Sequence, residues 1–323
     1  MDRLLTEPFQ IGSVRVRNRV LLAPLAGIGN WFVRLQAKRF GAGMAFSEMV
    51  SSFGVRYGGD KTLSMLRIDD AEREGGPVAI QLFGQDPEVM RIAAARVAEA
   101  GADIVDLNMG CPVPKVCKTG AGAALLGDPD LAVAVARAAR EGSGLPVTVK
   151  LRSGRRPGET GGFELAHRLV EEAGVAAITF HPRSAAVHHK GSPDLELAAR
   201  LAAELPVPVI VSGGLSDADS VRRTFKETGA AAVVLARGSL GNPWLFAQAL
   251  GARSGEPTRE EVLAELDWIM DRAVEHFGPV RAGRWLRKAY PWYLERLGAG
   301  KELGHTLQQT DTADEARSVL AAA

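Results

Sequence analysis

Residues 106–126 carry the pattern in this sequence that most strongly suggests chemistry. An apolar run over residues 104–108 is followed within three positions by Cys111, and a second cysteine, Cys117, comes six positions later in the same segment, among lysine, proline and glycine residues. A thiol at the carboxyl end of a predicted strand, on a flexible loop, is placed for reaction rather than for packing.

Three roles are open for Cys111 on sequence alone. It could be a small buried hydrophobic residue, a nucleophile or a general acid. No Cys–His pairing is visible, which weighs against the nucleophile. A thiol with a pKa near ~8.5 is mostly protonated at neutral pH and can donate a proton to a carbanion-like centre. The general acid is the best fit if a hydride donor lies nearby.

Cationic and imidazole side chains follow two later apolar runs. Lys150 closes one of them, and a lysine there is costly to desolvate unless an anion meets it, although a solvated lysine at a strand end is the simpler alternative. An anionic edge of a reduced flavin would suit it. His181 and Arg183 follow the next run, with three more His or Lys residues over 188–190. No carboxylate or second cysteine lies at ligand spacing, so we expect an anion-facing loop and no metal.

Glycine-containing turns close the last two apolar runs. They are Ser212-Gly213-Gly214 and Ala236-Arg237-Gly238. Glycine permits close approach of a ligand to backbone N–H groups, which predicts phosphate binding, although an ordinary tight turn is the alternative.

Eight short apolar runs alternate with segments of helical composition. Most are continuous rather than alternating, as expected for parallel strands covered on both faces. We predict strands at residues 19–23, 44–47, 78–83, 104–108, 147–151, 177–181, 207–212 and 232–236. Helix starts are predicted at Asp86-Pro87, Asp128-Pro129, Ser192-Pro193 and Asn242-Pro243. This favours an α/β fold, a (β/α)8 TIM barrel, with a doubly wound sheet as the alternative.

A barrel would place the candidate residues together, because chemistry in this fold lies at the carboxyl ends of the strands. After residue 250 the strand-like runs stop, and a capping box at Thr258 opens the first of three predicted helices, at 262–277, 280–296 and 312–322. We therefore predict a catalytic barrel domain over residues 1–250 and a small all-helical domain over residues 251–323.

Composition narrows the class of protein further. Hydrophobic residues make up 46% and charged residues 24%, and the formal net charge is +1, so a polyanion would have to meet a local patch. The charged N-terminal segment does not resemble a signal peptide, and no stretch is apolar enough to span a bilayer. With only two cysteines, close together, a cytoplasmic protein is expected. We also expect a monomer.

Taken together, these segments resemble the flavin-dependent tRNA-dihydrouridine synthases, most closely a bacterial branch of that family. The resemblance runs from about residue 10 to the last helix and rests mainly on Asn108-Met109-Gly110-Cys111-Pro112. The other matching segments are Ala23-Pro24-Leu25-Ala26-Gly27, Ser47-Glu48-Met49-Val50-Ser51-Ser52, Lys150-Leu151-Arg152, His181-Pro182-Arg183, Gly241-Asn242-Pro243-Trp244, Arg287-Lys288 and Trp292-Tyr293-Leu294.

The resemblance implies FMN at the barrel mouth, reduced by NADPH or NADH, and reduction of a uridine in tRNA to 5,6-dihydrouridine. FMN would give hydride to C6, and Cys111 would protonate C5 from the opposite side. Asn108 would contact the cofactor and orient the base. The remaining cofactor residues would be Pro24, Leu25 and Ala26 beside the flavin, Gln81 and Lys150 at its polar edge, His181 next to it, and Ser212, Gly213, Gly214, Ala236 and Arg237 at its phosphate.

A cationic stripe in the tail is the candidate RNA surface. Arg281, Arg284, Arg287 and Lys288 fall in one helical sector without an acid between them, near four aromatic residues, although a solvated face over core aromatics is the alternative. Arg183 is a further candidate. From Glu256 onward the tail holds nine Lys and Arg against twelve Asp and Glu.

The chain departs from the family pattern at two of the glycine-containing turns, and these departures bear on the identity of the RNA target more than on the redox chemistry. Ser212-Gly213-Gly214 stands where relatives have Asn-Gly-Asp, and Ala236 where they have Gly. Three other functions stay open: a barrel flavoenzyme acting on a free pyrimidine, as dihydroorotate dehydrogenases do; dihydrouridine synthesis in ribosomal RNA; and an RNA-binding protein without catalysis.

Overall fold

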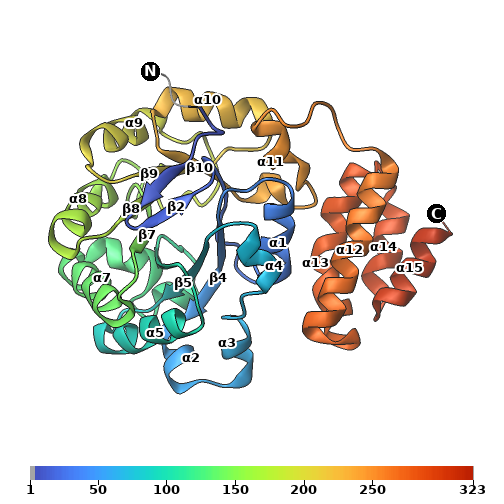
Figure 1. Ribbon diagram of the computed structural model, residues 1–323, viewed down its shortest axis with the longest axis horizontal. Helices are drawn as coiled ribbons and strands as arrows, with labels where there is room; N and C mark the ends of the chain where they lie inside the picture. Colours follow the sequence, from blue (N-terminus) through green and yellow to red (C-terminus); the bar gives the residue numbers. More distant parts are fainter. Residues whose placement is uncertain (1–3, 323) are drawn as a thin grey trace.

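A closed barrel of eight parallel strands forms the centre of the protein (Figure 1). The computed structural model describes residues 4–322, so the first three residues of the charged N-terminal segment lie outside the described part. The barrel strands are β3 (Val20–Leu22), β4 (Ala45–Ser51), β5 (Val78–Phe83), β6 (Ile104–Met109), β7 (Val147–Arg152), β8 (Ala177–His181), β9 (Val209–Ser212) and β10 (Ala232–Leu235). β10 pairs with β3 and closes the ring. The predicted barrel is confirmed, and the doubly wound sheet is excluded.

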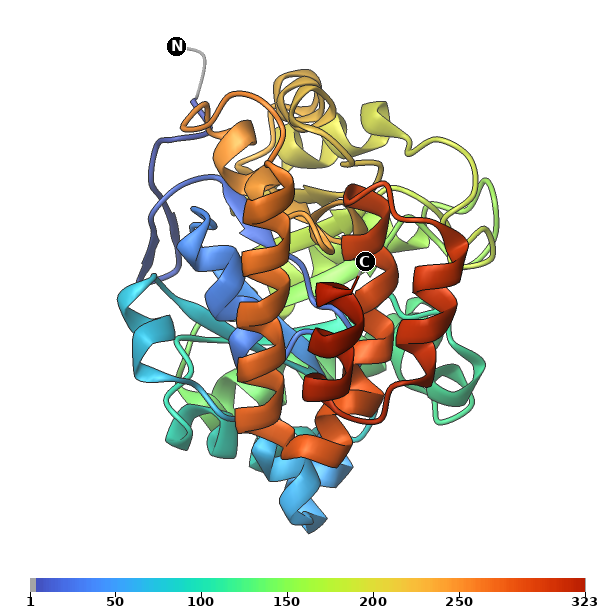
Figure 2. The ribbon, with the colours of Figure 1, turned by 90° about the vertical axis from the view of Figure 1, so that its right-hand side faces the viewer.

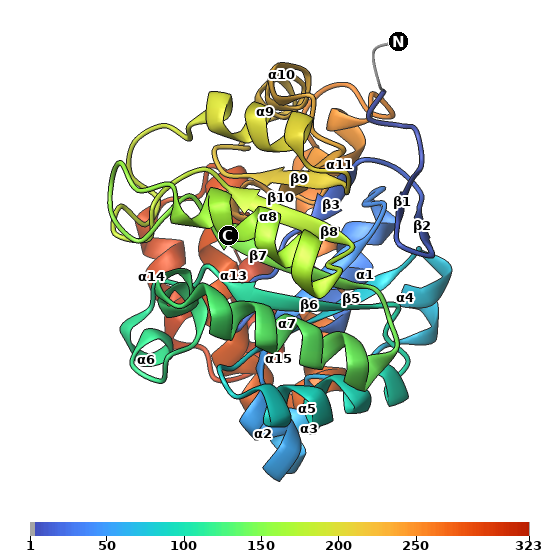
Figure 3. The ribbon, with the colours of Figure 1, turned by 90° about the vertical axis from the view of Figure 1, so that its left-hand side faces the viewer.

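Helices surround the barrel, as Figure 3 shows from the side opposite the C-terminal helices. They are α1 (Trp31–Arg39), α5 (Pro87–Glu99), α7 (Pro129–Ser143), α8 (Gly161–Ala173), α9 (Leu195–Glu204), α10 (Ala218–Thr228) and α11 (Trp244–Ala249). The predicted caps Asp86 and Asp128 each accept a hydrogen bond from the third backbone N–H of their helix. The start at Ser192-Pro193 is wrong, because Asp194 caps α9. The start at Asn242-Pro243 is one residue early, and α11 has no side-chain cap.

Short elements that lack a clear hydrophobic period were not predicted. The hairpin of β1 (Phe9–Ile11) and β2 (Val14–Val16) precedes the barrel. Three short helices, α2 (Ser52–Tyr57), α3 (Asp60–Ser64) and α4 (Asp70–Glu74), connect β4 to β5. The connections after β6 and β10 contain α6 (Pro114–Cys117), η1 (Gly122–Gly127) and η2 (Arg237–Ser239).

The inside of the barrel changes from apolar to polar along the strands. Towards the amino ends, Ile104 belongs to a buried apolar cluster that includes residues of six other barrel strands. Two positions further along β6, the buried carboxyl group of Asp106 bonds to side chains of β5 and β7. Alternate residues of a strand share a face, so the polar groups gather near the carboxyl ends, where the predicted site lies.

Four helices follow the barrel: α12 (Arg259–Phe277), α13 (Pro279–Arg296), α14 (Lys301–Gln309) and α15 (Ala313–Ala321). They lie against one side of the barrel next to α1, as Figures 1 and 2 show. The Thr258 capping box is confirmed, and α14 was not predicted. One apolar cluster joins these helices to the barrel, with Phe32 of α1 packed 5.0 Å from Trp285 of α13.

The described residues show neither a membrane span nor a metal cluster. No helix between residues 4 and 322 is long and apolar enough to cross a bilayer. The same residues contain no group of three or more His, Cys, Asp and Glu side chains that could hold a metal ion.

Candidate active site

Asn108 fixes the loop that carries Cys111. Its side-chain oxygen accepts hydrogen bonds from the backbone N–H groups of Gly110 (3.2 Å) and Cys111 (2.9 Å). The thiol of Cys117 donates to the carbonyl oxygen of Cys111 at 3.3 Å, and both cysteines are free thiols. Half-burial raises the pKa of the Cys111 thiol above its usual range, which keeps it protonated near neutral pH.

A chain of hydrogen bonds runs from the barrel interior to Cys111. The buried amide of Gln81 donates to Asp106 (2.6 Å), Asn108 donates to the oxygen of Gln81 (2.9 Å), and the oxygen of Asn108 accepts from the Cys111 N–H. Burial raises the pKa of Asp106 to about 7, while the hydrogen bonds from Thr148 and Gln81 and the charge of Lys150 lower it. In its ionised form Asp106 only accepts, and it then sets the orientation of both amides. Sequence reasoning missed Asp106, since its role depends on the register of β5, β6 and β7.

Lys150 enters the same space from β7, where it is opposite Asn108 in the sheet. Burial and the nearby Arg152 lower its pKa to about 8, while Asp106 raises it. Its ammonium group makes no hydrogen bond to any residue in the described chain. An unpaired cation in this position is suited to receive an anion.

His181 is a neutral hydrogen-bonding group. Burial, together with Lys150 and neighbouring arginines, lowers its pKa to about 2. The guanidinium of Arg183 lies 3.2 Å from Nε2 of His181, and since arginine can only donate, the ring proton must be on Nδ1. Arg183 is buried and also donates to the carbonyl of Gly191. Its guanidinium is therefore directed into the barrel mouth.

The two glycine-containing turns lie close to these side chains. Gly213 has a φ of +107°, and a Cβ atom there would lie 2.7 Å from the His181 ring and 3.0 Å from Arg183. A Cβ atom on Gly238 would lie 2.2 Å from the carbonyl oxygen of Leu215. The buried hydroxyl of Ser212 has no hydrogen-bond partner within residues 4–322. Both turns therefore require glycine. The Ser212 hydroxyl in the first turn is available to bond to a ligand.

Cations outnumber acids in this region. Burial lowers the pKa of His189, and Arg237, Arg152 and Arg183 lower it further. The pKa of Arg183 is lowered first by burial and then by Arg237. No carboxylate is among the groups that act on either residue. Such a cluster favours a phosphate ligand.

Arg152 was not predicted as a site residue, although it lies within a matched segment. It is buried and donates to the carbonyl of Gly110 (2.9 Å), next to Cys111, and to the carbonyls of Ser184 (3.1 Å) and His188 (2.8 Å). It thereby ties the loop after β6 to the loop after β8.

The other predicted residues divide between the mouth and α13. In the loop after β3, Leu25 is buried, Pro24 is half-buried and Ala26 is exposed. Ala236, half-buried, and Arg237, exposed, follow β10.

On α13, Arg281 and Arg284 are exposed. Arg287 is paired with Asp311 at 2.7 Å, and Lys288 donates to the carbonyl of Gly27 at 3.2 Å. The cationic stripe is thus partly occupied by internal contacts.

Solved structures with a similar fold are barrel oxidoreductases. Morphinone reductase superposes with a TM-score of 0.60 at 19% identity, over 81% of this chain and 93% of that protein. The old yellow enzyme homologue from Zymomonas mobilis superposes with a TM-score of 0.57 at 14% identity, over 80% and 96%. At this identity the likeness establishes the TIM-barrel fold and nothing further.

Sequence relatives identify the family. The family model for dihydrouridine synthase matches residues 21–323. The tRNA-dihydrouridine synthase B of Pseudomonas aeruginosa is 34% identical over 313 residues, which is 94% of this chain and 92% of that protein. The protein of the same name from Escherichia coli K12 is 33% identical over 97% of this chain and 98% of its own length. The chain belongs to the dihydrouridine synthase family.

Proposed function

We propose that this protein is a flavin-dependent, NAD(P)H-consuming enzyme that reduces a uridine of tRNA to 5,6-dihydrouridine, with FMN as its cofactor. Family membership supports the reaction, and the relatives of known name act on tRNA. The observation that carries the proposal is the meeting, at one barrel mouth, of a protonated thiol, an unpaired lysine and a cluster of cations.

The residues present fit FMN. The Ser212–Gly214 and Ala236–Gly238 turns, with Arg183 and Arg237, would hold its phosphate, because they offer cations, backbone N–H groups and the unpaired hydroxyl of Ser212. Lys150 and Gln81 would meet the polar edge of the ring, with His181 as a neutral donor beside it. Pro24, Leu25 and Ala26 would lie against the ring.

Each of these residues has a defined chemical task. Bound FMN would supply the hydride that C6 of the uracil ring receives. Cys111 donates the proton that C5 receives, for which its raised pKa is suited. Asn108 holds the Cys111 backbone by its oxygen and keeps its amide beside Gln81, at the place where the base would enter.

The RNA surface would lie on α13, with Arg281 and Arg284 as the phosphate contacts. The Arg284 guanidinium makes no hydrogen bond or ion pair within residues 4–322, so an RNA phosphate would not have to displace an internal partner. The target uridine must leave its stack to reach the mouth, at a cost of a few kcal/mol. A tRNA substrate and two free thiols fit a cytoplasmic protein.

Reconstitution with defined components tests this proposal. Purified protein with FMN, NADPH and an unmodified tRNA transcript is expected to form dihydrouridine, and to reduce neither free uridine nor orotate. Product on ribosomal RNA but not on tRNA would contradict the substrate assignment. Failure to bind any flavin would contradict the cofactor assignment.

A further inference from the structure

The peptide groups of Gly27 are held from two sides of the molecule. Its N–H donates to a carboxylate oxygen of Glu48, in β4, at 2.8 Å. Its carbonyl oxygen accepts from the indole N–H of Trp285 and from the ammonium of Lys288, both in α13 and both at 3.2 Å. Gly27 directly follows Ala26, so the segment expected to border the flavin is bonded to a helix about 260 residues later in the chain.

The geometry at Gly27 depends on glycine. Its φ is +73°, a region that other L-residues rarely adopt, and an added Cβ atom would lie 3.3 Å from the Lys288 nitrogen. The positive φ therefore favours glycine at this position.

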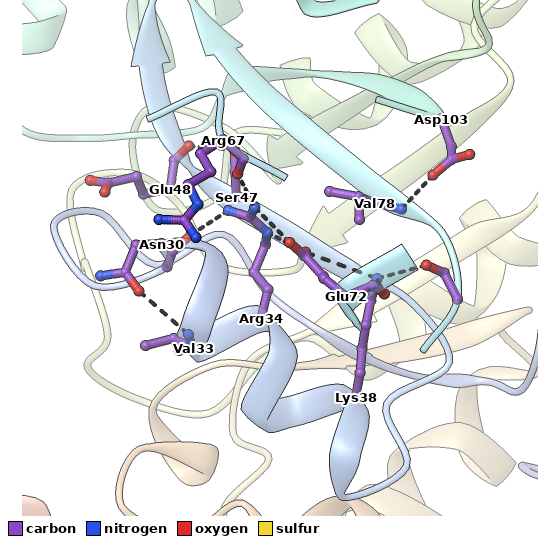
Figure 4. A network of polar contacts seen from close by, with 12 residues as sticks. Asn30, Val33, Arg34, Lys38, Ser47, Glu48, Arg67, Glu72, Val78 and Asp103 are labelled. Carbon is purple, nitrogen blue, oxygen red and sulfur yellow. Dashed lines mark hydrogen bonds and ion pairs between the residues drawn. The ribbon is translucent and has the colours of Figure 1, made fainter. Parts of the chain in front are cut away.

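Glu48 lies beside a network of polar contacts that includes Arg34 and Glu72 (Figure 4). Its backbone N–H donates to the carbonyl of Gly29 at 3.0 Å, and the same carbonyl accepts from Arg34 at 3.1 Å. Arg34 is fully buried and forms two hydrogen bonds to the carboxylate of Glu72, at 2.6 and 2.9 Å. The backbone of Glu48 is therefore connected, through the Gly29 carbonyl, to a buried ion pair inside the protein.

On the other side of Gly27, the bonding partners from α13 are Trp285 and Lys288. Trp285 is buried against Phe32 of α1, which fixes the direction of its indole N–H. Lys288 is exposed, but its charge acts on Glu48: burial raises the pKa of Glu48, while the Gly27 N–H, Lys288, Arg34 and Lys61 lower it. Glu48 and Lys288 thus bond to the N–H and to the carbonyl oxygen of the same residue.

We propose that Lys288, with Trp285 and Glu48, is a positioning residue for the flavin rather than a phosphate contact for RNA. By holding Gly27, these three side chains set the place of Pro24, Leu25 and Ala26 against the cofactor ring. The proposal rests on the proposed function, because it assumes that this segment borders the flavin.

Titration of the apoprotein with FMN, followed by quenching of flavin fluorescence, tests the proposal without any turnover. Lys288→Met should raise the Kd for FMN about three- to tenfold, the range expected for one lost hydrogen bond to a positioned loop. Lys301→Met is the matched control, since Lys301 is an exposed lysine at the start of α14 with no side-chain partner in the described chain, and it should leave the Kd unchanged. Trp285→Phe removes the indole donor together with part of the buried ring, and should act in the same direction as Lys288→Met.

The salt dependence of tRNA binding separates the two roles of Lys288. For a positioning residue, Lys288→Met leaves the slope of log K against log salt unchanged, whereas loss of a phosphate contact lowers it by about 0.7 to 0.9. Unchanged FMN affinity together with a lowered slope would overturn the proposal. A wild-type protein that binds no flavin would instead contradict the proposed function.

Discussion

The barrel mouth and the surface of α13 both carry cations, yet they differ in how those cations are held. At the mouth, Lys150, Arg152 and Arg183 are buried or half-buried, and the nearby carboxyl group of Asp106 is already bonded to two side chains. On α13, Arg281 and Arg284 are exposed, and Arg287 has its own acidic partner. Water weakens interactions at the surface much more than at the mouth. Single changes should therefore be severe at the mouth and mild on α13.

The largest effect is expected at the thiol itself. Cys111→Ala should lower dihydrouridine formation at least ~100-fold, because it removes the proton donor, while FMN binding and its reduction by NADPH persist. Rapid-mix reduction of the flavin and product analysis by mass spectrometry would measure the two steps separately. Cys117→Ser is the matched control and should be nearly silent, because a serine hydroxyl can also donate to the Cys111 carbonyl. Full product yield from Cys111→Ala would show that Cys111 is not the general acid.

A smaller loss is expected from the carboxyl group beneath the thiol. Asp106→Asn replaces one of two acceptor oxygens by a donor, so Gln81 or Thr148 must turn, and product formation should fall roughly tenfold. If Asp106→Asn has wild-type kinetics, the hydrogen-bond chain does not position Cys111.

The pH dependence of cofactor binding tests the unpaired lysine. Lys150 has a pKa of about 8 in the free protein, so it is charged below that pH and neutral above it. FMN affinity should fall severalfold as the pH rises from 7 to 9, and Lys150→Arg should flatten the profile because arginine stays charged. Isothermal titration of the apoprotein at several pH values would measure this. A wild-type profile as flat as that of the arginine variant would exclude Lys150 as the charge that meets the flavin.

The smallest effect is expected on α13. Arg284→Met should weaken tRNA binding only about two- to fivefold at moderate salt and lower the salt slope by about 0.7 to 0.9, with FMN affinity unchanged. Filter binding over a range of potassium chloride concentrations would show it. If Arg284→Met weakened FMN binding as much as Lys288→Met does, Arg284 would not be a contact for RNA alone.

The sequence predicted what depends on local pattern. The eight strands follow from continuous apolar runs, and Asn108, Lys150 and His181 were expected together because a barrel brings strand ends to one mouth. The roles of Asp106 and Glu48 were not predicted, since each depends on which strands and loops are neighbours in space. The contact between Gly27 and Lys288 spans 261 positions, so no local sequence pattern predicts it. The short helices α2 to α4 were missed because they are too short to show a hydrophobic period.

Mapping of dihydrouridine in RNA from cells that lack this protein tests whether the protein reduces uridine in tRNA. We expect loss of dihydrouridine at one or more tRNA positions, recovery with the wild-type chain, and no recovery with Cys111→Ala. Unchanged dihydrouridine in tRNA, or a loss confined to ribosomal RNA, would contradict it.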